Sequence, residues 1–134
     1  MPRLELDDDK HCFACGEKNP IGLKLGFLLE SESLLTTFTP QKNHQGYKDI
    51  VHGGIISLVL DEVMVNLLWK LGKPAVTAEL KINLRKPAKI GQKLFFKSSI
   101  REENTRMINV CADARDESND VVAEATAKCV RVQQ

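Results

Sequence analysis

The sequence has no excess of charge of either sign and no long uninterrupted apolar run. Lysine and arginine total 19 and aspartate and glutamate total 18, so the formal net charge is +1. A nearly neutral chain gives no electrostatic reason to expect nucleic acid or an anionic membrane surface as a partner. The most apolar region, Ile55 to Leu71, is interrupted by Asp61, Glu62, Asn66 and Lys70. These polar residues argue against a transmembrane helix.

Cysteine is also scarce, and the N-terminal residues are polar. The segment Met1 to Lys10 contains no apolar stretch of the kind found in a secretion signal. Four cysteines in 134 residues do not indicate a disulfide-bonded scaffold, because a chain of this length can bury a sizeable core. We therefore expect the reducing environment of the cytoplasm.

Two of the cysteines have the spacing of metal ligands. Cys12 and Cys15 follow His11, and a Cys-x-x-Cys pair is common in zinc sites. A closed zinc site needs four ligands, and the sequence contains no second pair of this kind. His44 could contribute only if the fold brought it near. We expect no bound metal and no organic cofactor.

The order of apolar and polar residues predicts one domain, residues 23–134, after an irregular segment, residues 1–22. Alternation over Leu23 to Leu29 and Leu34 to Phe38 predicts two strands joined by a turn at residues 30–32. A polar loop follows up to Val51. Gly53 to Leu71 is the one convincing helix, and Gly72 suits its end. Its apolar residues cover most of its circumference, so we expect it to be buried.

After the helix the pattern is that of strands alone. Residues 76–84, 93–101, 106–115 and 121–129 each alternate between apolar and polar positions. The inward positions of the last two strands are mostly alanine, which lets a sheet curve around a bulky element. We predict an α+β fold in which one long antiparallel sheet wraps around a single buried helix. Cys129 is expected in the core of this sheet, and Cys111 on its polar face.

The most informative stretch joins the polar loop to the helix. Gly53 and Gly54 begin the helix, where unpaired backbone N–H groups carry partial positive charge. Such groups can bind the oxygen that becomes negative during acyl transfer. Asp61 follows Gly54 by seven residues, about two helical turns, and therefore lies roughly on the same face. Glu62, Asn66 and Lys70 form a separate ridge that we expect to be solvated.

These features resemble the hot-dog fold thioesterases, in particular the acyl-CoA thioesterases of the phenylacetate-degradation type. The resemblance covers about residues 11–132. It rests on four stretches: Val51 to Asp61, Thr77 to Leu80, Arg85 to Ala88 with Gly91, and His11 to Gly16 with Asn19 to Leu23. It implies subunits that pair sheet edge to sheet edge as a homodimer or a dimer of dimers. It also implies an acyl-CoA site at the dimer interface, with the carboxylate often supplied by the other subunit.

The resemblance also implies roles for single residues. Asp61 would be the catalytic carboxylate, with Gly54, and less well Gly53, as the oxyanion donor. His52 would orient the loop without acting as a base. Thr77 stands where relatives place a hydroxyl near the attacking water, although strand alternation alone would make it an ordinary outward threonine.

Substrate contacts follow in the same way. Arg85 and Lys86 would bind the phosphates of CoA, because basic side chains bind phosphate oxygens well; a solvated strand end is the plainer interpretation. Relatives often carry a polar side chain where this chain has Gly46. That difference leaves Gln45, His44 or no side chain to position the water or the carbonyl.

The predicted reaction is hydrolysis of acyl-CoA thioesters, with Asp61 as general base or as nucleophile. The acyl group cannot be read from the pattern. A hot-dog hydratase would place a histidine five residues after the aspartate, and residue 66 is asparagine. The alternative is a non-catalytic module that binds acyl-CoA or a protein partner, and Gly46 keeps that alternative open.

Overall fold

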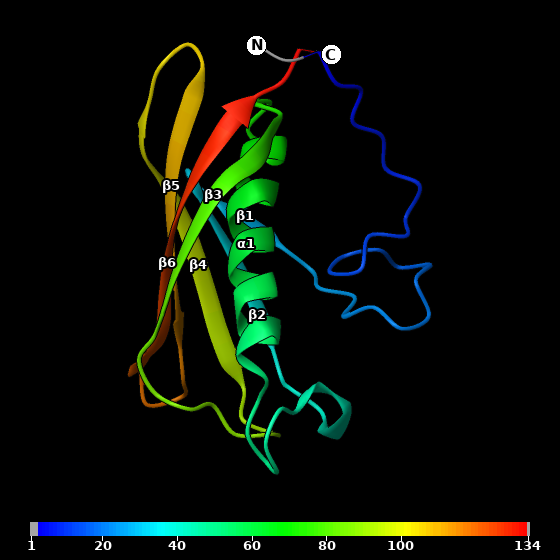
Figure 1. Ribbon diagram of the computed structural model, residues 1–134, viewed down its shortest axis with the longest axis vertical. Coiled ribbons are helices and arrows are strands. Elements are labelled where there is room, and N and C mark those ends of the chain that lie inside the picture. Colours follow the sequence, from blue (N-terminus) through cyan, green and yellow to red (C-terminus); the bar gives the residue numbers. More distant parts are fainter. Residues whose placement is uncertain (1–2, 134) are drawn as a thin grey trace.

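A computed structural model describes residues 3–133 as a single sheet with one helix against it (Figure 1). The six strands are antiparallel throughout, in the order β1-β2-β4-β5-β6-β3. The elements are β1 (Leu28–Glu30), β2 (Ser33–Phe38), the short 3₁₀ turn η1 (Lys42–His44), α1 (Gly53–Lys70), β3 (Ala75–Leu84), β4 (Leu94–Glu103), β5 (Met107–Arg115) and β6 (Val121–Arg131). This arrangement confirms the predicted hot-dog architecture.

The core lies between α1 and one face of the sheet. Seven residues of α1 are buried: Ile56, Val59, Leu60, Val63, Met64, Leu67 and Leu68. Opposite them, β5 and β6 contribute buried alanines, including Ala114, Ala123 and Ala127. These small side chains let the helix approach the sheet, and the Ser98 hydroxyl of β4 donates a hydrogen bond to the Val63 carbonyl at 2.6 Å. Cys129 is fully buried here, as predicted.

Strand β3 is one edge of the sheet and contains a β-bulge. Thr77 pairs with Cys129 and Glu79 pairs with Lys128, so Ala78 is the extra residue. Cys129 faces the helix, and Thr77 beside it faces the helix too. After the bulge, Leu80 lies opposite Ala127 and Leu84 opposite Ala123, again on the helix side. Strand alternation alone would make Thr77 an outward residue, but the bulge shifts the alternation by one residue and puts Thr77 on the helix side.

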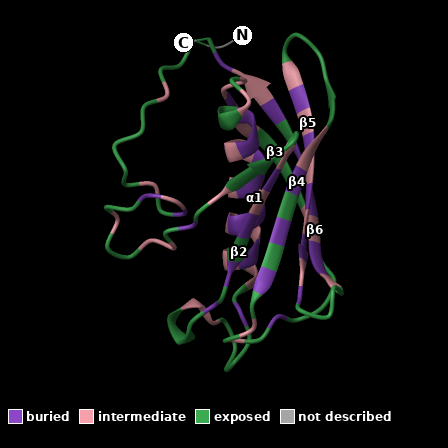
Figure 2. Cartoon of the chain, turned by 180° about the vertical axis from the view of Figure 1, so that it is seen from behind, coloured by how far each residue is buried: buried purple, intermediate pink, exposed green. Residues whose placement is uncertain are grey.

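The N-terminal segment packs over the side of α1 that faces away from the sheet (Figures 1 and 2). Its described part, residues 3–22, contains no helix and no named strand; Met1 and Pro2 lie outside the described residues. Ala14 is nonetheless buried in the main core. The predicted first strand is shorter than expected, and β1 begins only at Leu28. Before it, Lys24 has a left-handed φ of 52°, and the Leu23 and Leu25 N–H groups donate to carbonyls of the N-terminal segment. Among the described helices, none is long and apolar enough to cross a bilayer.

Candidate active site

The helix α1 begins with a cap supplied by the His52 side chain. His52 has extended backbone angles, and its Nδ1 accepts a hydrogen bond from the Gly54 N–H at 2.9 Å. Its own N–H donates to the His44 carbonyl at 3.0 Å, which ties the preceding loop to the helix start. His52 thus links the preceding loop to the helix start through both its backbone and its side chain. Its predicted role in orienting the loop for the reaction stays a prediction.

The same hydrogen bond bears on which of the two glycine N–H groups can bind a substrate oxygen. Because the Gly54 N–H already donates to His52, a substrate oxygen would have to displace the imidazole to reach it. Among the described residues, no hydrogen-bond partner is found for the Gly53 N–H, which stands at the first helical position. Gly53 thus offers the donor that no described group engages, although the sequence favoured Gly54.

A hollow of about 650 Å³ lies beside the helix start. Its lining includes His52 and Gly53 from the helix start, Gly46 and Tyr47 from the preceding loop, and Leu84 at the end of β3. Tyr47 is 87% exposed. The missing side chain at Gly46 leaves open space next to His52, since an added Cβ would be 3.4 Å from the His52 Cα. Apolar and backbone groups dominate this hollow, and it is large enough for part of a ligand.

The polar candidates near the hollow have partners within the chain. Lys86 lines the hollow, and its Nζ lies 2.7 Å from Asp116 and 3.2 Å from Asp120. Arg85 pairs with Glu124. Hydrogen bonding to Asp116 and Asp120 raises the pKa of Lys86, and the same contact with Lys86 lowers the pKa of Asp116.

The Gln45 side chain makes a hydrogen bond within its own loop. Its Oε1 accepts a hydrogen bond from the Asp49 N–H at 3.1 Å, and it does not belong to the lining of the hollow. His44 stacks at a tilt against Phe38, and its Nδ1 accepts the Gln41 N–H at 2.9 Å. Burial lowers the pKa of His44.

Asp61 forms the second part of the candidate site, on the flank of α1 that faces β3. The Thr77 hydroxyl donates a hydrogen bond to Asp61 Oδ1 at 2.8 Å. Asp61 is half-buried. Among the residues that the structure describes, no hydrogen-bond partner is found for Oδ2. Strand alternation did not reveal this pairing, because it depends on the bulge at Ala78.

Cys129 is a neighbour of this pair that the sequence did not single out. It lies opposite Thr77 on β6 and is fully buried. Burial is the main cause that raises the pKa of its thiol, and the nearby Asp61 charge adds to the rise, while a contact with Thr77 opposes it. The buried Cys129 thiol thus lies next to Thr77 and near the charge of Asp61. The one feature of the sequence that pointed to Cys129 was its position on the apolar face of a predicted strand.

Within one chain the two parts of the site do not meet. Seven to eight residues of helix separate the glycine N–H groups from Asp61, which is about 10–12 Å along the axis. A reacting carbonyl must lie about 3–3.5 Å from the group that attacks it. This axial separation is longer than a direct attack by Asp61 on a carbonyl bound at the helix start of its own chain would favour.

The neighbouring flank of α1, about 100° from Asp61, differs from the prediction. Glu62 and Asn66 are half-buried beneath the N-terminal segment, so the expected solvated ridge exists only at the exposed Lys70. The Cys12 thiol donates to Glu62 Oε1 at 3.7 Å, and Asn66 Nδ2 donates to the same oxygen at 2.6 Å. Burial, followed by the Glu62 charge, raises the pKa of Cys15 far above its usual value.

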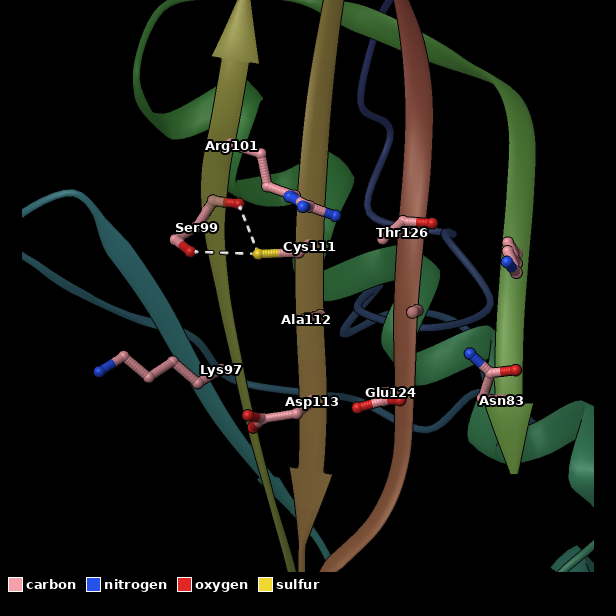
Figure 3. A pocket seen from close by; sticks show the side chains of 11 residues that line it. Asn83, Lys97, Ser99, Arg101, Cys111, Ala112, Asp113, Glu124 and Thr126 are labelled. Atoms are coloured by element: carbon pink, nitrogen blue, oxygen red, sulfur yellow. Dashed lines mark hydrogen bonds between the residues drawn. The ribbon is translucent and has the colours of Figure 1, made fainter. Parts of the chain in front are cut away.

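Another hollow, of about 590 Å³, lies on the outer face of the sheet, away from α1 (Figure 3). Charged side chains of both signs surround it, among them Lys97, Arg101, Asp113 and Glu124. Cys111 lies on this polar face, as predicted, and its thiol contacts the Ser99 hydroxyl at 3.4 Å. None of the predicted site residues lines this hollow.

Known structures share this fold over most of the chain. A thioesterase superfamily protein matches with a TM-score of 0.85 and 24% identity, over 90% of this chain but only 60% of its own. A phenylacetic acid degradation-related protein from Ralstonia eutropha matches with a TM-score of 0.72 and 24% identity, over 81% of this chain and 85% of its own. A hypothetical thioesterase protein from Streptococcus pneumoniae, solved with coenzyme A, gives 0.77 and 19%, over 82% and 90%.

The family itself is established by a match at the level of sequence. A search of curated proteins finds no match. The family model of the thioesterase superfamily, however, matches residues 48–123, more than half of the chain. This range contains α1 with its glycine start, Asp61, and β3 with Thr77. The chain belongs to the thioesterase superfamily.

Proposed function

We propose that this protein hydrolyses acyl-CoA thioesters to a free acid and CoA. The observation that carries the proposal is the Asp61 carboxylate, held by the Thr77 hydroxyl at 2.8 Å on the helix of a chain of the thioesterase superfamily. A half-buried carboxylate with one oxygen oriented and the other available suits a base or a nucleophile.

A solved relative supports the same pair of residues. The thioesterase protein from Streptococcus pneumoniae has been crystallised with coenzyme A, and also as variants in which an aspartate and a threonine were each replaced by alanine. Those two residues are 16 positions apart in that chain, as Asp61 and Thr77 are in this one. We infer that both chains use the pair for the same purpose.

The complete site is proposed to need two subunits. The separation of about 10–12 Å along α1 disfavours a direct attack within one chain, so the carbonyl bound at one helix start is proposed to meet the carboxylate of another copy. The edge strand β3 supplies a surface for that copy, because its outer edge carries unpaired backbone groups. Leu84 is 56% exposed and Leu80 38% exposed on this strand. A homodimer with paired β3 edges would cover both.

In the proposed reaction the thioester oxygen binds the N–H groups at the helix start of one subunit. As a base, Asp61 of the other subunit takes a proton from water while the hydroxide adds to the carbonyl carbon. The tetrahedral intermediate then expels CoA thiolate, which receives the proton. As a nucleophile, Asp61 instead displaces CoA thiolate to form a mixed anhydride, and water then cleaves the anhydride. Thr77 holds the carboxylate in either route, and Cys129 keeps its inner side free of water.

The hollow at the helix start is proposed to hold the substrate near the thioester. Arg85 and Lys86 stand beside it and are suited to the phosphates of CoA. Both side chains pair with carboxylates within the chain. A phosphate would have to replace Glu124 as the partner of Arg85 and Asp116 as the partner of Lys86. Gln45 would act through the conformation of its loop, and Gly46 by leaving room beside His52.

The second candidate is a module that binds acyl-CoA or a protein partner without turnover. One observation favours it: the Gly54 N–H is engaged by His52, and Gly46 supplies no polar group to position water. A thiol-release assay across acyl-CoAs of different chain length and aromaticity separates the two. We expect turnover of at least one substrate at catalytic enzyme concentration. Binding without thiol release would favour the module.

The assembly is tested separately. We expect light scattering to give the mass of a homodimer or of a dimer of dimers at micromolar concentration. A stable monomer that still hydrolyses acyl-CoA would contradict the shared site.

A further inference from the structure

Three possible metal ligands converge between the N-terminal segment and α1. The Sγ atoms of Cys12 and Cys15 and a carboxylate oxygen of Glu62 all lie within 4.8 Å of one another, and all three residues are half-buried. The two cysteines and Glu62 are 47 to 50 positions apart, so only the fold brings them together. The prediction of no metal counted cysteine and histidine alone, and therefore missed Glu62.

The loop that carries the cysteines is built to turn both thiols toward the helix. The Gly16 N–H donates to the Cys12 carbonyl at 2.8 Å, and the Cys15 N–H points to the Cys12 Sγ at 3.5 Å. A side chain at Gly16 has no room, since its Cβ would be 2.4 Å from the Cys12 nitrogen. Ala14, between the cysteines, is buried in the core and anchors the turn.

A polar side chain already orients the third candidate ligand. Asn66, one turn after Glu62, donates to Glu62 Oε1 at 2.6 Å and lies 3.9 Å from the Cys15 Sγ. Hydrogen bonds of this kind hold ligating carboxylates and thiolates in metal sites. No lysine or arginine lines the adjoining hollow of about 440 Å³, so within the described residues no cation of the chain faces Glu62 from that space.

We propose that Cys12, Cys15 and Glu62 bind one divalent transition ion of the zinc class. Two thiolates and one carboxylate are ligands that Zn²⁺ accepts in tetrahedral geometry. With Zn–S bonds of about 2.3 Å, tetrahedral ligand atoms lie about 3.8 Å apart, so the cluster needs to contract only slightly. The fourth position opens into the hollow, which His11 also lines. The bound ion fastens residues 12–15 to α1.

Metal content of the full-length protein tests the site directly. Protein produced in zinc-supplemented medium and purified without chelators should contain about one zinc per chain by elemental analysis. Cys12→Ser should lose most of it. Cys111→Ser is the matched control, because Cys111 lies on the outer face of the sheet beside Ser99 and should leave the content unchanged. If Cys12→Ser does not fold, Glu62→Gln carries the same comparison.

Cobalt distinguishes thiolate ligation from surface binding. The metal-free protein should bind added Co²⁺ with a thiolate-to-metal absorption band that is absent in Cys12→Ser and present in Cys111→Ser. Asn66→Ala should weaken Zn²⁺ affinity by roughly 10- to 100-fold, as loss of an orienting neighbour does. The proposal is overturned if metal-free protein shows no such band, or if zinc content is the same in Cys12→Ser. It is equally overturned if the purified protein has no zinc and an intact mass that indicates a Cys12–Cys15 disulfide.

Discussion

The two flanks of α1 present adjacent carboxylates to different surroundings. Asp61 faces β3, where the Thr77 hydroxyl holds one of its oxygens. Glu62 points about 100° away, under the N-terminal segment, where a thiol and an amide donate to it. The partners around each flank, more than the residue type, therefore distinguish a carboxylate suited to catalysis from one suited to holding a segment in place.

The largest expected effect is on the Asp61 flank. Asp61→Asn keeps the size of the side chain but removes the charge, so the protein should fold and turnover should fall roughly 100-fold or more. Glu62→Gln, the matched change one residue later, should alter turnover only a few-fold. Steady-state kinetics with the best acyl-CoA, together with circular dichroism, checks both. A folded Asp61→Asn protein with nearly normal hydrolysis would refute the catalytic assignment. A greater loss of turnover in Glu62→Gln would mean that Glu62, and not Asp61, is the catalytic carboxylate.

Thr77 should show a smaller effect through the same carboxylate. Thr77→Ala removes a hydrogen bond to a charged group, a loss of about 1.5–3 kcal/mol that corresponds to about 10- to 100-fold in kcat. Thr77→Ser keeps the hydroxyl and should recover most of the activity, with KM little changed in both. Equal rates in Thr77→Ala and the unmodified protein would mean that the contact does not orient Asp61.

At the helix start we expect a loss below the roughly 100-fold that removal of an oxyanion donor costs. In Gly54→Ala the donor remains, but the added methyl would lie 3.0 Å from His52 Nδ1 and press on the imidazole. In Gly53→Ala the methyl meets only the flexible end of Leu84, at 2.9 Å. Kinetics of the two variants should therefore differ, with the greater change in kcat at Gly54. If neither variant lost activity, the helix start would have no part in the reaction.

The smallest effect is expected away from both flanks, at the pair of Lys86 and Asp116, and it appears as a pH dependence of stability. The pKa of Asp116 is lowered by Lys86, so the ion pair contributes stability above the ordinary pKa of 3.8, and this is lost as the pH falls through the lowered value. Asp116→Asn should lower the melting temperature near neutrality and converge with the unmodified protein in acid. Parallel melting curves at every pH would contradict the linkage.

Much of the fold follows from local patterns in the sequence. The helix ends within one residue of the predicted Leu71, because Gly72 adopts a left-handed φ of 73° that suits a helix end. The strands after the helix could be predicted because apolar positions recur every second residue. The outward Cys111 and the buried Cys129 follow from the same periodicity.

The candidate site could be predicted only in part, since its contacts are long-range. A prediction from alternating apolar and polar residues assumes that the strand is regular. The extra residue Ala78 instead puts Thr77 on the face opposite to the expected one. The neighbours of Glu62 come from a segment without regular structure, whose path no periodicity describes. The hydrogen bond from Gly54 to His52 depends on a side-chain orientation that helix-start preferences do not determine.

The distance along α1 between its first residues and Asp61 has a consequence in genetic terms. If each site combines the helix start of one copy with Asp61 of the other, two inactive variants can complement each other. A mixed dimer of Asp61→Asn with a variant disabled only at its helix start has one site in which both halves are intact. Random exchange of the two inactive proteins would restore activity at about a quarter of all sites.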